Sequence, residues 1–160
     1  GMLMVMRVVV VLLIGLIVTV MGLLSVSQAA APPVDPFALY SDLMGGDQVL
    51  LALRNRRFSC QTAFSDNNLN CSTQLTDAPF SRIDITLVNG FPAGISFDVN
   101  QTALRVGDLV VLWGMPEIIP QSGGVNLYWA KNQVTAGVPT LNSSHLDYHA
   151  PVYFVNFTLN

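Results

Sequence analysis

The amino-acid sequence predicts an α+β fold, in which an N-terminal hydrophobic helix precedes a helical hairpin and a short helix packed on an antiparallel sheet of about five strands. Apolar residues recur at helical spacing between residues 36 and 57 and again over 107–116. From residue 82 onward apolar and polar residues alternate one by one, as in strands that bury a single face. Both patterns require the helices and the sheet to cover each other.

An uncharged apolar run occupies residues 8–24, directly after Arg7, and small residues follow it. This layout is typical of a secretory signal peptide, the first of two expectations for residues 1–28. Together with residues 2–6 the run also reaches the ~20 residues that cross a bilayer, so an uncleaved transmembrane anchor is the alternative. Both alternatives place residues 36–160 outside the cytoplasm, either in a single-pass protein of the cell membrane or, after cleavage, in a secreted or periplasmic one.

A short linker, residues 29–35 (AAAPPVD), is expected to lead into one extracytoplasmic domain, residues 36–160. Asp35 before Pro36 is typical of a helix start, because an aspartate caps the amino terminus and proline suits the first turn. The apolar spacing continues to Gly45-Gly46, where the first helix is expected to end.

A second helix is expected to begin after a capping Asp47 and to end in three arginines. Arg54, Arg56 and Arg57 form the only cluster of positive charge in the sequence. Cations are favourable at the carboxyl end of a helix, so a solvated helix end explains them. They are also candidate interface residues for an anionic partner or a lipid headgroup.

The chain contains two cysteines, Cys60 and Cys71, on either side of a polar segment. In an exported domain such a pair predicts a disulfide, here one that closes a polar loop. A redox-active or metal-binding pair would need Cys-x-x-Cys spacing and further Cys or His ligands, which this segment lacks.

Alternation of apolar and polar residues predicts strands at 82–87 and 95–100, joined by a turn over Asn89–Gly94. The remaining alternation predicts three more strands, at 125–129, 134–138 and 153–159. In the last of them Tyr153, Val155, Phe157 and Leu159 are expected on one side.

Residues 107–116 are expected to form a short helix, with Asp108 as its cap and Gly114 as its stop. The β-branched pair Val110-Val111 leaves a strand as the alternative. Tyr128 is expected on the solvent-exposed face of the predicted strand 125–129. An aromatic side chain there is a candidate interface anchor.

Six residues from Gly46 (GDQVLL) are echoed by six from Gly107 (GDLVVL), and each copy precedes a predicted hairpin. Two similar units side by side would explain the echo, although a helix cap followed by apolar residues also recurs by chance.

The segment Gly107–Pro116, followed by Leu127-Tyr128-Trp129, resembles small outer-membrane assembly lipoproteins and β-lactamase-inhibitor-like domains over about 25 residues. In those families a glycine opens a short helix, a Leu-x-Gly-x-Pro turn closes it and an aromatic strand follows. The resemblance implies helices on an antiparallel sheet that binds proteins rather than catalyses a reaction. Unlike the lipoproteins, this chain has no cysteine near its export segment.

A different function would follow from His145, Asp147 and His149, because alternate residues of an extended strand share a face. Two imidazoles and a carboxylate could then bind a metal, as in a secreted metal-dependent enzyme. The flanking Asn, Ser and Pro residues instead indicate a loop, so no metal ligand is assigned and no cofactor is expected.

The net charge of −3, with charged residues making up only 11%, excludes the basic surface of a nucleic-acid-binding protein. No nucleophile motif or phosphate-binding loop is present. We therefore expect a non-catalytic accessory or scaffolding subunit, or a protein-binding module, of a larger membrane assembly. Its expected contacts are protein partners and, through residues 8–24 if these are retained, the lipid bilayer. The alternatives are the metal-dependent enzyme and a self-associating surface protein.

Overall fold

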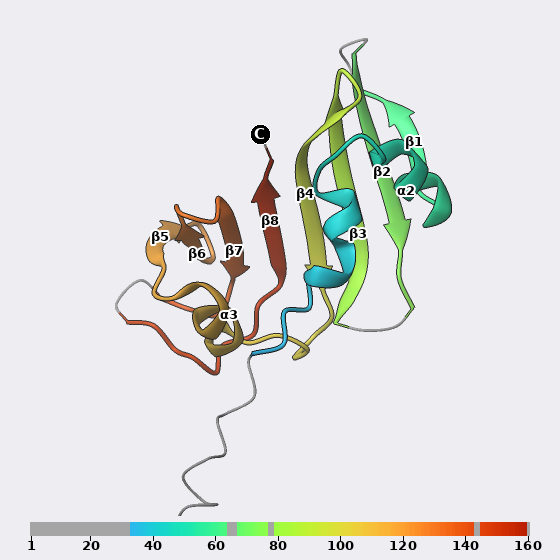
Figure 1. The fold of residues 1–160 in the computed structure, drawn as a ribbon. Coiled ribbons are helices and arrows are strands. Elements are labelled where there is room, and N and C mark those ends of the chain that lie inside the picture. The colour runs from blue at the N-terminus through green and yellow to red at the C-terminus, as the bar shows by residue number, and fades with distance from the viewer. Residues whose placement is uncertain (1–32, 64–66, 77–78, 143–144, 160) are drawn as a thin grey trace, which may run out of the picture. The chain divides into compact units, whose positions relative to one another are not determined.

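Eight antiparallel strands form a single sheet in a computed structural model of the chain (Figure 1). The structure describes residues 33–63, 67–76, 79–142 and 145–159. The chain divides into two units, Gly1–Pro33 and Val34–Asn160, and the fold described below is that of the second. The predicted signal peptide or anchor, residues 1–28, lies outside the described residues.

Three helices and the eight strands follow one another along the second unit. Their order is η1 (Ala38–Leu43), α2 (Val49–Asn55), β1 (Ser59–Thr62), β2 (Asn68–Gln74), β3 (Phe80–Val88), β4 (Phe91–Val99), α3 (Val106–Trp113), β5 (Glu117–Gln121), β6 (Gly124–Trp129), β7 (Val134–Val138) and β8 (Phe154–Thr158).

The sheet consists of two consecutive four-stranded meanders, with the order β1-β2-β3-β4-β8-β7-β6-β5. Helices η1 and α2 precede the first meander and α3 precedes the second. The last strand of each half, β4 and β8, pair with each other and join the two halves. The prediction of an α+β fold is confirmed, but the predicted strand number was too low because β1, β2 and β5 were missed.

The missed strands carry little apolar alternation. All four residues of β1 are exposed, and β2 has only Leu69 and Cys71 as apolar residues. Within the segment predicted as a polar loop between the two cysteines, residues 61–62 and 68–70 belong instead to the paired strands β1 and β2. β5 contains Pro120, which a sheet tolerates on an edge strand such as this one.

The helices cover one face of the sheet, where an aromatic cluster centres on Phe37. Its ring lies 5.1 Å from the rings of both Phe80 and Phe97, which belong to β3 and β4. It also stacks on Trp113 of α3 at 5.5 Å. Trp113 in turn packs edge-on against Trp129 of β6. One residue before η1 therefore connects the strands of the first half to the helix of the second.

Local signals at the helix ends are only partly as predicted. The Asp35 carboxylate accepts a hydrogen bond from the Phe37 backbone N–H at 2.9 Å, as a capping residue does, but the helix that follows is a 3₁₀ helix. The prediction that Asp47 caps the second helix was wrong, because Gln48 occupies that position and no side chain caps it.

The short helix predicted at 107–116 is confirmed as α3, and the strand alternative for it was wrong. It begins one residue before Gly107, so Asp108 is not the N-cap but lies in the first turn. There its carboxylate accepts a hydrogen bond from the Arg105 N–H at 2.8 Å. Gly114 ends the helix with φ +80°, as predicted.

Arg57 ends α2 in a left-handed conformation, with φ +59°. The Phe58 N–H bonds to the Leu53 carbonyl and the Arg57 N–H to the Arg54 carbonyl, which is the Schellman arrangement. A glycine is the usual residue at this position, because a Cβ there crowds the backbone.

We expect Arg57→Gly to raise the free energy of unfolding by roughly 0.5–1 kcal/mol, because glycine adopts positive φ without strain. Urea denaturation followed by circular dichroism measures the change. The matched control, Arg54→Gly, lies inside α2 and should lose roughly 1 kcal/mol instead. A loss of stability in Arg57→Gly would contradict the assignment of the helix end.

Candidate functional site

The face of the sheet opposite the helices is a candidate binding surface. Because successive residues of a strand point to opposite faces, each row of cross-strand partners belongs to one face. One apolar row belongs to the core, and all its members except Cys60 and Phe157 are buried. This row comprises Cys60, Cys71, Ile85, Ile95, Phe157, Val134 and Trp129.

The neighbouring row crosses all eight strands and contains only polar residues and one tyrosine. Each member is exposed or half-buried. We call this row and its neighbours on the same side the polar face. The row comprises Ser59, Ser72, Asp84, Ser96, Asn156, Thr135, Tyr128 and Glu117.

Two shallow hollows lie on the polar face. The larger, about 360 Å³, lies over β1–β3 and includes Asn70 and Ser72. The second, about 230 Å³, includes Ser96 and Asn156, and both hollows are lined by Asp84. The polar face is therefore continuous across the first half of the sheet and into β8.

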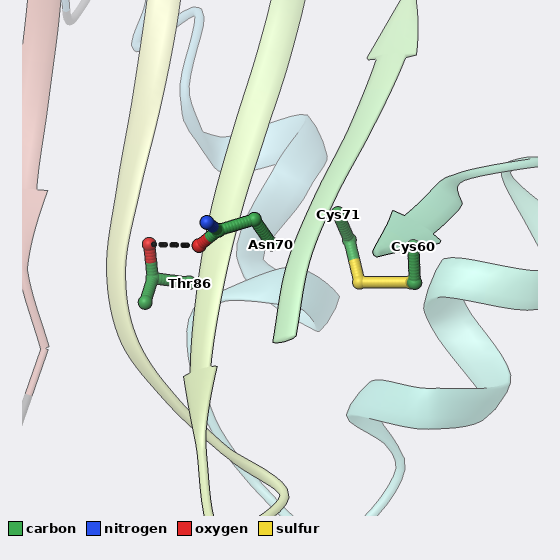
Figure 2. Close-up of a disulfide and its surroundings, with 4 residues drawn as sticks. All are labelled: Cys60, Asn70, Cys71 and Thr86. Atoms are coloured by element: carbon green, nitrogen blue, oxygen red, sulfur yellow. Dashed lines mark hydrogen bonds between the residues drawn. A yellow bond between two sulfur atoms is a disulfide. The ribbon is translucent and has the colours of Figure 1, made fainter. Parts of the chain in front are cut away.

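Two hydrogen bonds between side chains constrain parts of the polar face. The Ser96 hydroxyl donates to the Asn156 amide oxygen, and the Thr86 hydroxyl donates to the Asn70 amide oxygen at 3.3 Å (Figure 2). These pairs link neighbouring strands. A surface with fixed side chains loses less conformational entropy when a partner binds it.

Arg82 and Asp84 form the ion pair of this face, with Nη2 2.7 Å and Nε 3.0 Å from the same carboxylate oxygen. The hydrogen bond and the charge of Asp84 raise the pKa of the Arg82 guanidinium. The two charges therefore compensate each other locally, and most of the remaining face is neutral.

Tyr128, predicted to be an interface anchor, lies half-buried in the polar row of β6, between Glu117 and Thr135. The sequence predicts that this residue lies on the exposed face, but not that Ser72, Ser96 and Asn156 lie in the same row. Their strands lie far apart in the sequence, and serine and asparagine give no periodic signal.

The three arginines predicted as a cluster have different surroundings. The Arg56 guanidinium pairs with the Asp42 carboxylate at 2.8 Å and donates to the Leu39 carbonyl at 2.7 Å. It also lies over the Tyr40 ring. Arg56 therefore fastens α2 to η1, while Arg54 and Arg57 remain exposed.

The residues considered for a metal site lie in the loop between β7 and β8. His145, Asp147 and His149 are all exposed. The Asp147 carboxylate accepts the His149 backbone N–H at 2.9 Å, and the His149 carbonyl accepts a hydrogen bond from Arg105. Within the part of the chain that the structure describes, no three His, Cys, Asp or Glu residues are grouped so as to hold a metal ion.

The predicted disulfide between Cys60 and Cys71 is confirmed (Figure 2). The two cysteines are direct cross-strand partners of β1 and β2, and Cys71 is only 1% exposed. The bond therefore fixes the edge strand β1 at the end of the apolar row, where few other apolar contacts hold it.

Replacing both cysteines, as Cys60→Ser with Cys71→Ser, should lower the free energy of unfolding by roughly 3 kcal/mol, because the unfolded chain is no longer closed into a loop. Guanidinium denaturation of the oxidised wild type and the double variant gives the difference. Ser59→Ala, next to the disulfide on β1, is the control and should change stability little. A difference below about 1 kcal/mol would show that the disulfide does not support the fold.

No helix among the described residues is long and apolar enough to span a membrane; the run 8–24 lies outside them. Comparison of the chain with protein families, with curated proteins and with solved structures finds no match. Function is therefore inferred from the geometry of the polar face.

Proposed function

We propose that the protein is a non-catalytic, extracytoplasmic binding module that acts as an accessory or scaffolding subunit of a membrane assembly. It binds a protein partner through the polar face of its sheet. The observation that carries this proposal is the polar row across eight strands, whose members are all exposed or half-buried.

The chemistry of the polar face favours association with another protein. Removing a charged group from water costs far more than removing a hydroxyl or an amide that finds a hydrogen-bond partner. Serine, threonine and asparagine predominate in the polar row, and the charge of its Asp84 is compensated by Arg82. Tyr128 adds a large side chain of the kind that concentrates binding energy at interfaces.

The proposed location outside the cytoplasm depends on the apolar run 8–24 and on the disulfide. Disulfides persist in oxidising compartments and are rare in the reducing cytosol. The Cys60–Cys71 bond is consistent with an exported domain, and the short linker 29–35 would keep that domain near the membrane if the run is retained.

We expect Ser96→Arg in the tagged full chain to reduce the partner recovered from detergent-solubilised native membranes by at least about tenfold. The substitution puts a large charged side chain in the middle of the polar face, where it blocks close approach of a partner. Quantitative mass spectrometry of the purified complex measures the recovery, and thermal denaturation confirms that the variant is folded.

Ser41→Arg is the matched control, because Ser41 is an exposed serine of η1. This control should recover the same partner as the wild type. A wild-type chain that purifies alone as a monomer would contradict the proposal, as would equal loss of the partner in both variants. A complex that contains only copies of the chain would support the self-associating alternative instead.

A further inference from the structure

A third hollow, of about 310 Å³, lies at the β5–β6 turn and the adjoining ends of β7 and β8. It is distinct from the two hollows over the first half of the sheet and shares no residue with them. Pockets that bind small molecules combine an aromatic or apolar surface with a few polar groups. This hollow has both.

The aromatic surface of the hollow depends on a glycine. Asn126, Gly137 and Phe154 are cross-strand partners in one row of the polar face, on β6, β7 and β8. A Cβ atom at position 137 would overlap Cδ1, Cε1 and Cζ of Phe154, so the ring lies directly on the Gly137 backbone. Phe154 is half-buried, and Asn126 lies on the other side of Gly137 in the same row.

The polar groups of the hollow are neutral. Gln121, Ser122 and Asn126 supply amide and hydroxyl groups, and Tyr153 adds an aromatic ring that is 46% exposed. Amides both donate and accept hydrogen bonds. None of the described residues that line the hollow carries a charge, which favours an uncharged ligand over a phosphate, a carboxylate or a cation.

We propose that this hollow binds a neutral sugar ring of a glycan. The C–H groups on one side of a pyranose ring carry partial positive charge and are attracted to the negative face of an aromatic ring, here Phe154. The hydroxyl groups at the edge of the sugar then match the amides of Asn126 and Gln121, which can donate and accept at once. The inference is independent of the protein partner proposed above.

The size of the hollow suits one sugar ring rather than an oligosaccharide, because it lies at the lower end of the range for ligand pockets. A single ring has few atoms, so we expect a dissociation constant of roughly millimolar. A proline-rich peptide is the competing ligand, since such peptides also dock on aromatic side chains. A sugar is favoured because the hollow offers several amide and hydroxyl groups, which can form hydrogen bonds with the hydroxyl groups of a sugar.

Saturation-transfer difference NMR on the full chain, in nanodiscs or a detergent without sugar headgroups, tests the proposal. The probes are the methyl glycosides of glucose, galactose, mannose and N-acetylglucosamine, at millimolar concentrations. At least one glycoside should receive saturation, most strongly at the C–H groups of one ring face. Phe154→Ala should weaken its binding about fivefold to tenfold, because the stacking surface is lost.

Phe91→Ala is the control for loss of an aromatic residue, because Phe91 is 68% exposed at the β3–β4 turn and should not affect binding. Asn126→Leu and Gln121→Met keep the aromatic ring and remove hydrogen-bonding groups. Both variants should also weaken binding of the glycoside. They provide the test if Phe154→Ala fails to fold.

Three outcomes would overturn the proposal. In the first, no glycoside receives saturation at tens of millimolar. In the second, Asn126→Leu binds the glycoside as tightly as the wild type, and so does Phe154→Ala if that variant folds. In the third, a proline-rich peptide binds with the same dependence on Phe154 while no glycoside does.

Discussion

The rest of the structure depends on one constraint of the antiparallel sheet. Along each strand, successive side chains lie on opposite faces of the sheet. Once the helices bury the row that contains Ile85 and Ile95, the next row along every strand must lie on the opposite face. Shifting the register of one strand by one residue would exchange its two rows, so the apolar core and the polar face specify each other. Phe37 fixes this arrangement from outside the sheet, because its ring packs on β3, β4, β8 and α3 together.

The two halves of the sheet share a plan, a helix followed by a four-stranded meander, and meet at their last strands. A repeated unit would explain this shared plan. The two similar six-residue segments that suggested a repeat, however, do not occupy equivalent positions. Gly46 precedes α2, whereas Gly107 is the second residue of α3. The similar six-residue segments therefore occupy different positions in their helices. If the halves are repeats, the likeness is one of topology and not of this motif.

Elements with one apolar face could be predicted from the sequence. The strands around Ile83, Ile95, Leu127 and Val134 were predicted for this reason, as was α3. β1 and β2 could not be found in this way, because the disulfide replaces most of the apolar contacts that would reveal them. Apolar periodicity also could not reveal the candidate binding surfaces. Tyr128 was identified on its own, whereas the polar row depends on strand order and the third hollow depends on Phe154 lying over Gly137.

Cysteine labelling in native membranes measures whether a partner covers the polar face. Ser96→Cys, labelled with a membrane-impermeant maleimide, reports on the middle of that face, and Ser41→Cys reports on η1. If a partner covers the polar face, both positions react in the purified monomer and only position 96 is protected in the native assembly. Equal reaction of position 96 in native membranes and in the purified monomer would show that no partner covers the polar face.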